Sequence, residues 1–277
     1  MKKLVFLIAI SYSVFSCSKV ADGEYLITGN AKGISNGKMV ILKKKNDYGI
    51  VVNVDSAKVK DGKFELKGKV KEPSMFALFI KDLQQPIPFI LETGEIEVKV
   101  DKDSIWKSEI GGTYNNEEFQ KFNIKMNSVQ KKLVEYQNKN FQKLMTAQQK
   151  KDNLAIEKLK NGYKNIQKEL EDFMAKYPEE NPKAFISLLL LESQFNSPKF
   201  NLDSFKKTYN KLDSSLKSTK VAKGIEEKLK AIDNNNKIKP EAALIGSGFI
   251  CEGSGVDFIL QSSLRTTETC RGALMPI

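Results

Sequence analysis

Apolar and polar residues alternate in the first part of the chain, with the period of two that is typical of half-buried strands. The runs 57–59 and 64–66 alternate on either side of Asp61-Gly62, a dipeptide that predicts a tight β-hairpin. Residues 96–100 alternate in the same way. Other short runs rich in β-branched and aromatic residues are 25–28, 39–42, 51–54, 75–80 and 88–91. Closely spaced short strands separated by turns predict an antiparallel β-sandwich.

From Asn115 onward, apolar residues recur every three or four positions, which is the period of an amphipathic helix. The first apolar stripe is Phe119, Phe122, Met126, Val129, Leu133 and Tyr136. The second is Ile156, Leu159, Tyr163, Ile166, Leu170, Phe173 and Tyr177. Narrow stripes on highly charged segments predict two long helices that pack as an antiparallel, coiled-coil-like hairpin. We expect residues 150–153 to form the turn and Pro178 to end the second helix.

Three shorter helices are predicted after this hairpin, at 185–191, 202–216 and 220–232, followed by a linker at 233–237. The chain is therefore expected to be an α+β protein. Its predicted parts are a sandwich domain at 24–112, a helical hairpin or bundle region at 115–233, and an irregular linker and tail at 234–277.

The N-terminus has the pattern of an export signal. Lys2 and Lys3 precede an apolar run at 4–15, which is too short to span a bilayer permanently. The sequence Val-Phe-Ser-Cys that ends at Cys17 resembles a bacterial lipobox, in which the cysteine is acylated and becomes the first residue of the mature protein. We expect 1–16 to be a cleaved signal peptide and 17–23 a linker to the lipid anchor. A plain signal peptide that happens to contain a cysteine is the alternative.

Acyl chains on Cys17 would hold the protein on a membrane surface of the cell envelope, facing the periplasm or on the outer membrane. The formal net charge of +11 permits binding to nucleic acid or to anionic surfaces. The lysines, however, are scattered among acidic and amide residues rather than gathered in a basic block. We therefore expect no nucleic-acid partner. The alternative is a binder of nucleic acid or anionic surfaces through the lysine-rich helices, which would be retained on heparin and released by salt.

The residue types that usually carry catalysis are scarce. The chain contains no histidine, so Ser-His and Cys-His nucleophiles and histidine metal sites are excluded. Apart from Cys17, only Cys251 and Cys270 are present, and their separation fits neither a C-x-x-C redox pair nor a metal site. Adjacent carboxylates at Glu117-Glu118 and Glu171-Asp172 are expected to face solvent. We predict no catalytic residue, metal or cofactor, and hence a protein that is not an enzyme.

Several short segments of the sequence resemble those of one known family. They are 55–68 (DSAKVKDGKFELKG), Glu72-Pro73, 89–96, and two phrases in the helical part at 181–185 and 218–224. Over roughly residues 22–239 the chain is similar to the front part of Bacteroidetes lipoproteins of the TlpA/ResA type. In these proteins a domain of unknown function, number 4369, precedes a thioredoxin-like module. The resemblance implies a β domain without established chemistry, followed by a thioredoxin fold with a Trp-Cys-x-x-Cys motif.

The C-terminal segment departs from that pattern, because no C-x-x-C follows Pro240. Every lysine precedes Pro240, whereas both arginines, Arg265 and Arg271, follow it. This change of composition leads to the hypothesis that the tail is read in a shifted frame or joined from elsewhere, and we expect it to be poorly ordered. A genuine short extension is the alternative.

Two functions are consistent with these patterns. The first is a lipid-anchored binding or spacer module, with an unknown protein or ligand at the β domain and no catalytic centre of its own. The alternative is the truncated front part of a thiol-disulfide oxidoreductase of envelope redox or cytochrome maturation.

Overall fold

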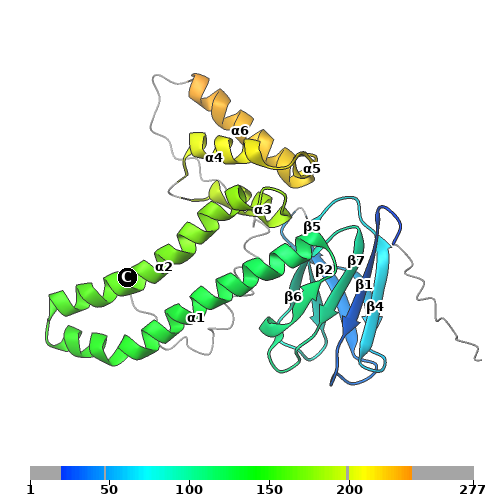
Figure 1. Ribbon diagram of the computed structural model, residues 1–277, viewed down its shortest axis with the longest axis horizontal. Coiled ribbons are helices and arrows are strands. Elements are labelled where there is room, and N and C mark those ends of the chain that lie inside the picture. The colour runs from blue at the N-terminus through cyan, green and yellow to red at the C-terminus, as the bar shows by residue number, and fades with distance from the viewer. Residues whose placement is uncertain (1–19, 47, 198–199, 239–277) are drawn as a thin grey trace, which may run out of the picture.

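The computed structural model describes residues 20–46, 48–197 and 200–238 of the chain, with side chains as far as Asn234. Strands arranged in two sheets come first and helices follow, so the predicted α+β class is confirmed (Figure 1). No helix in these ranges is long and apolar enough to cross a membrane.

Within the residues that the structure describes, eight strands form two four-stranded sheets. They are β1 Glu24–Asn30, β2 Met39–Lys45, β3 Val51–Lys58, β4 Lys63–Lys69, β5 Ser74–Ile80, β6 Ile87–Leu91, β7 Gly94–Lys99 and β8 Glu109–Gly111. One sheet has the order β4-β1-β7-β8 and the other has the order β3-β2-β5-β6. The predicted run 57–59 is the end of β3 and the start of the following turn, and β8 was not predicted.

One strand pair is parallel, whereas the sequence predicted only antiparallel pairing. β1 lies between β4 and β7, and it pairs with β7 in parallel, with Ile27 opposite Ile96. The parallel pair arises because β6 belongs to the other sheet, so the chain crosses between sheets before β7 starts beside β1. All other pairs of named strands are antiparallel in the part of the chain that is described.

Alternation in the strands places one set of side chains between the sheets. In β4, Phe64 and Leu66 are buried while Lys63, Glu65 and Lys67 are exposed, as predicted. The ring of Phe64 lies over Gly29 of β1, where an added Cβ would come within 2.0 Å of it. Glycine is therefore required at position 29 because the ring occupies the space of its side chain.

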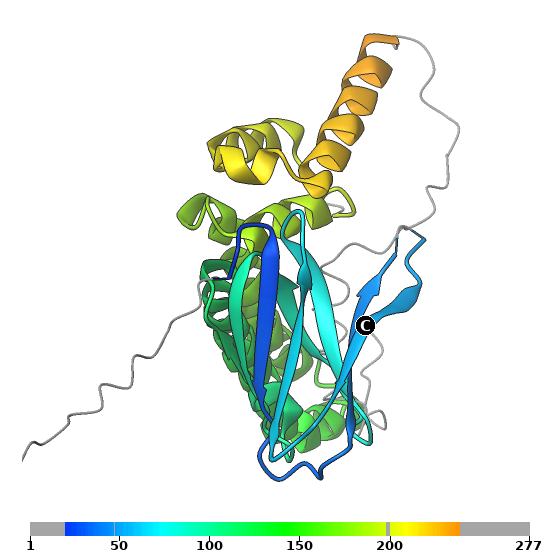
Figure 2. The same cartoon turned by 90° about the vertical axis from the view of Figure 1, so that its right-hand side faces the viewer.

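A short 3-10 turn at Ile105–Lys107 connects β7 to β8, and six α-helices follow β8 in the described part of the chain. They are α1 Tyr114–Gln149, α2 Asn153–Glu180, α3 Phe185–Gln194, α4 Leu202–Lys211, α5 Ser214–Lys217 and α6 Lys220–Ile238. α1 and α2 form the predicted antiparallel hairpin, which extends away from the sandwich (Figure 1). α3 and the helices after it lie over one end of the sandwich (Figure 2).

Three helix boundaries differ from the predictions. α2 continues two residues beyond Pro178, because in the last turn the proline removes only one backbone hydrogen bond. The helix predicted at 202–216 is interrupted at Leu212 and Asp213, where the backbone N–H of Asp213 donates to Pro182 and the Asp213 carboxylate caps α5. α6 continues to Ile238, through the segment that was predicted as a linker.

α3 is the centre of a second core, formed mainly by helices. All residues from Phe185 to Leu191 are buried, which explains why this run shows no helical period. Where α1 and α2 meet, Phe122 stacks on Phe173, and Tyr177 contacts both rings edge-on. Ile90, on the outer face of β6, belongs to this helical core. The sandwich and the helices therefore share a buried interface.

Two asparagines near the start of α1 join these parts. Asn116 is fully buried and makes two hydrogen bonds to the backbone of Ile90. Asn115 donates to the carboxylate of Glu92, and its carbonyl oxygen accepts the backbone N–H of Phe185 at 2.7 Å. The start of α1 is thereby fixed to β6 on one side and to α3 on the other.

Candidate functional site

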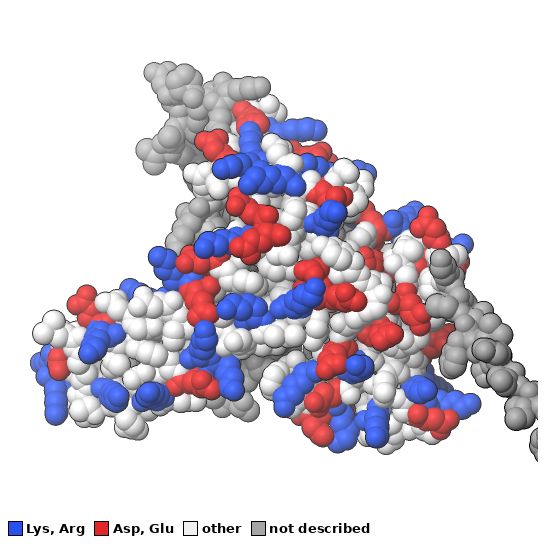
Figure 3. Space-filling model, in the orientation of Figure 1, with Lys and Arg blue, Asp and Glu red and all other residues white. Residues whose placement is uncertain are grey.

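The predicted site residue Cys17 lies outside the described residues, as do Cys251, Cys270 and the predicted tail after Pro240. Among the described residues, no group of three or more metal-ligating side chains is close enough to hold an ion. On the face shown in Figure 3, lysine and acidic side chains are interspersed.

The prediction for the adjacent carboxylates is correct for Glu117, Glu171 and Asp172, which are exposed, and wrong for Glu118. The Glu118 side chain is only 13 % exposed because it turns toward Lys121 and the hydroxyl of Tyr177. Burial, and then the Glu118 charge, raise the pKa of Tyr177. This contact joins α1 to α2 and has a structural role.

A cavity of about 490 Å³ lies where the sandwich meets the helices, and we name it the junction pocket. Its floor consists mainly of apolar side chains from three strands and α3, namely Tyr25, Phe76, Leu91, Phe185 and Leu189. Its cationic side chains come from β2, β4, the β4–β5 loop and α6, namely Lys44, Lys45, Lys69, Lys71 and Lys220. A volume of this size is in the range of small-molecule sites.

The walls of the junction pocket are held by hydrogen bonds between distant segments. The carboxylate of Glu72, in the loop after β4, accepts the backbone N–H of Lys220 at 2.9 Å. Lys220 is the first residue of α6, so a negative charge lies at the positive end of that helix. Asn46, another lining residue, accepts the backbone N–H groups of Tyr48 and Ile50 with its side-chain oxygen, which shapes the turn between β2 and β3.

The electrostatics of the pocket combine several cations with two carboxylates. Burial raises the pKa of Glu192, and the charge of Lys228 opposes this effect from 3.9 Å. The ammonium group of Lys44 lies 5.9 Å from the centre of the Phe76 ring, within cation–π range. Burial also raises the pKa of Tyr25, with a smaller contribution from Asp55. The pocket therefore offers an apolar floor and an excess of positive charge.

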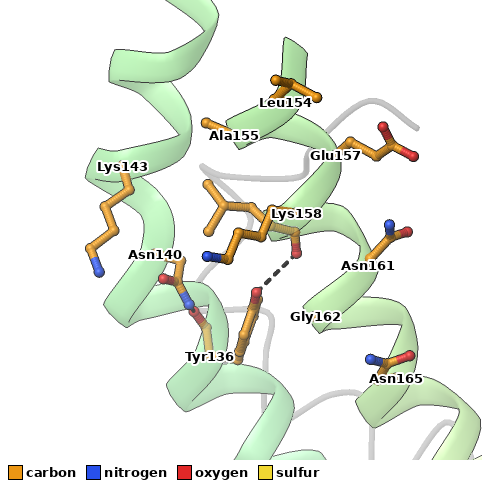
Figure 4. A pocket seen from close by; sticks show the side chains of 11 residues that line it. Tyr136, Asn140, Lys143, Leu154, Ala155, Glu157, Lys158, Asn161, Gly162 and Asn165 are labelled. Carbon is orange, nitrogen blue, oxygen red and sulfur yellow. Dashed lines mark hydrogen bonds between the residues drawn. The ribbon is translucent and has the colours of Figure 1, made fainter. Parts of the chain in front are cut away.

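A second cavity, of about 870 Å³, lies between α1 and α2 near their connecting turn, and we name it the hairpin pocket. Figure 4 shows Tyr136 crossing from α1 to donate a hydrogen bond to the backbone carbonyl of Leu159 at 3.0 Å. Gly162 leaves room for this ring, because an added Cβ would lie 2.1 Å from the hydroxyl oxygen. Leu154, at its border, is 81 % exposed. The space follows from helix packing around Tyr136, so the junction pocket is the stronger candidate site.

Sequence reasoning did not identify the junction pocket. The lysines were interpreted as a scattered surface, but the fold brings residues 44, 69, 71 and 220 around one cavity. Glu72 and Phe185 did belong to phrases that carry the family resemblance. The local sequence signal for this pocket was that lysines recur beside turns at 43–45 and 69–71. This recurrence by itself does not indicate that the two segments line one site.

Comparison with protein families gives a match to the first part of the chain. Residues 25–119 match the model of a family described as Domain of unknown function (DUF4369). The match covers the sandwich from Tyr25 onward and the first residues of α1. Searches of the curated proteins and of the solved structures found no match to the chain.

Proposed function

Residues 25–119 form a domain of the DUF4369 family, and from this premise we propose that the chain is a non-catalytic binding module of the cell envelope. Its ligand binds in the junction pocket. Acyl chains on Cys17 hold the protein at a membrane, and the α1–α2 hairpin acts as a spacer.

The observation that carries this proposal is that the sandwich and the helices together form the junction pocket. The DUF4369 domain supplies most of its lining, and α3 and α6 complete it. The backbone N–H of Lys220 donates to Glu72 and that of Phe185 donates to Asn115, and these hydrogen bonds hold the parts in place. A preformed site binds with less loss of conformational entropy than one that must be assembled.

The start of the described chain is compatible with a short membrane tether. The backbone N–H of Val70 donates to Gly23 at 2.8 Å, and that of Glu24 donates to Ala21 at 3.0 Å. The segment is thus tied to the sandwich from Ala21 onward. Ala21 is four positions after Cys17, which corresponds to about 14 Å when the chain is fully extended. An acylated Cys17 would keep the sandwich close to the lipid surface.

The spacer role is based on the length of the helical hairpin. α1 has 36 residues, which corresponds to a rod of about 54 Å. Lys125 and Lys132 of α1 both contact the Glu169 carboxylate of α2, and these contacts hold the two helices together. A rod of this length can present its far end well away from the sandwich.

The proposal is tested by blocking the pocket from its rim. Val54 lines the junction pocket and Val51 of the same strand does not, yet their exposed fractions are similar, 46 % and 44 %. We expect native mass spectrometry of the protein, purified from its own membranes, to show a bound small molecule that Val54→Trp removes. Val51→Trp, the matched control, should retain it. Retention in both variants would contradict a site in the junction pocket.

The other two parts of the proposal have separate tests. Mass spectrometry should find a diacylglyceryl group on Cys17 that is lost in Cys17→Ala, and an unmodified Cys17 in the mature protein would refute the anchor. Reduction of insulin by the full chain would refute the non-catalytic assignment.

A further inference from the structure

We propose that the ligand of the junction pocket is an amphiphilic anion, a small molecule with one apolar body and one anionic head. This inference rests on the proposed binding function and adds the chemical class of the ligand.

The apolar body of the ligand is matched by the floor of the cavity. Phe76, Leu91 and Leu189 are almost completely buried around it, and Val54 adds a half-exposed aliphatic side chain at the rim. Met75 lines the same space and is partly buried against the helical core. Removing the apolar surface of the ligand from water on such a floor provides a favourable contribution of about 25 cal/mol per Å².

The anionic head is matched by the lysines. Lys44 comes from β2, Lys69 from the end of β4 and Lys71 from the loop after it, so the positive charge approaches the cavity from two strands and a loop. A cavity with low-dielectric walls and charge of one sign focuses the field and favours the opposite charge in a ligand.

The two carboxylates of the pocket do not reverse this preference. The Glu72 carboxylate accepts the backbone N–H of Lys220 at the positive end of α6. The carboxylate of Glu192, in α3, lies 3.9 Å from the ammonium group of Lys228 in α6. Each carboxylate therefore has a positive group of the protein beside it, so these carboxylates do not cancel the charges of Lys44, Lys69 and Lys71. A cationic ligand would meet like charges, and a neutral apolar ligand would gain nothing from the charges of Lys44, Lys69 and Lys71.

The size of the cavity limits the ligand to a small molecule. About 490 Å³ accommodates a ligand of modest size, whereas a nucleic acid needs a continuous cationic track along its backbone.

The test compares two compounds of nearly the same shape, naphthalene-1-sulfonate, which is anionic, and naphthalene-1-sulfonamide, which is neutral. The protein is the acylated full chain in a neutral detergent, and the readout is the methyl NMR signal of Met75 during titration. We expect the sulfonate to bind at least about ten-fold more tightly than the sulfonamide. The double variant Lys69→Gln/Lys71→Gln should reduce this preference several-fold. Lys143→Gln/Lys158→Gln, with both changes in the hairpin pocket, should leave it unchanged.

The outcomes separate the ligand class from the proposed function. Equal affinity for both compounds, abolished by Val54→Trp, would overturn the anionic class and leave the junction pocket as a binding site. A preference for the sulfonate that survives the Lys69→Gln/Lys71→Gln change would also overturn the inference. If neither compound shifts the Met75 signal, or if Val54→Trp has no effect on binding, both the inference and the proposed site are wrong.

Discussion

The side-chain amide of Asn116 takes the place of a neighbouring strand beside Ile90. The backbone N–H of Ile90 donates to Asn116 Oδ1 at 2.9 Å, and Asn116 Nδ2 donates to the Ile90 carbonyl at 2.7 Å. β6 is the edge of its sheet, so these two backbone groups have no partner strand on that side. An exposed edge promotes wrong pairing, and here a helix covers it with one polar side chain.

Replacing Asn116 with alanine is expected to lower the free energy of unfolding by about 2–4 kcal/mol, because it leaves a buried donor and a buried acceptor unsatisfied. Urea denaturation measures this change. Asn161→Ala, at an exposed position of α2, is the control and should stay within about 0.5 kcal/mol of the parent protein. A similar small effect for Asn116→Ala would show that water replaces the amide.

Glu72 should be needed to fix α6 to the sandwich. Glu72→Ala removes the acceptor for the Lys220 N–H, and the loss of such a helix cap costs about 1 kcal/mol. We expect faster hydrogen exchange for the first turn of α6 and unchanged exchange within the sandwich. Glu65→Ala, on the exposed face of β4, is the control. Unaltered exchange in α6 would mean that packing alone positions this helix.

Two helical glycines should respond in opposite ways to alanine. At Gly224 an added Cβ meets no atom within 4 Å, so Gly224→Ala should stabilise the protein by up to about 1 kcal/mol. At Gly162 the Cβ would collide with Tyr136, so Gly162→Ala should destabilise it. Thermal unfolding of both variants tests this difference. In a Tyr136→Leu background the cost at Gly162 should disappear, and its persistence there would argue against the clash as its cause.

Glu192 should make stability depend on pH. Burial raises its pKa, so the folded protein holds the proton more readily than the unfolded chain does. The contribution to stability is complete below the ordinary carboxyl pKa of about 4.3 and is lost as the pH rises through the raised pKa. Lys228 offsets this only in part, because its side chain is half exposed.

Glu192→Gln should therefore unfold at the same temperature as the parent protein when the pH is below the ordinary carboxyl pKa. At neutral pH it should unfold at a higher temperature than the parent protein. It should also bind naphthalene-1-sulfonate more tightly at neutral pH, because one negative charge has left the pocket. Glu227→Gln, exposed on α6, is the control. Identical pH dependence for all three proteins would show that the Glu192 carboxyl is fully solvated.

Local patterns in the sequence determined most of the elements. Strict alternation identified Phe64 and Leu66 as the buried face of β4, because successive side chains of a strand point to opposite sides. The stripe from Phe119 to Leu133 identified the buried face of α1 for the corresponding helical reason. The phrases around Asp61-Gly62 and Glu72 were sufficient to indicate the domain family that the comparison found.

Tertiary structure decided the features that depend on residues far apart in the chain. The parallel pairing of β1 with β7 depends on the crossing between sheets, which leaves no trace in the alternation of either strand. Asn116 is an ordinary polar residue in its helix and acquires its role only because Ile90, 26 positions earlier, lies beside it. The junction pocket likewise exists only where Glu72 meets Lys220, 148 positions apart. Periodicity records which face of an element is buried, but it does not record what the buried face contacts, because that depends on the packing of the whole chain.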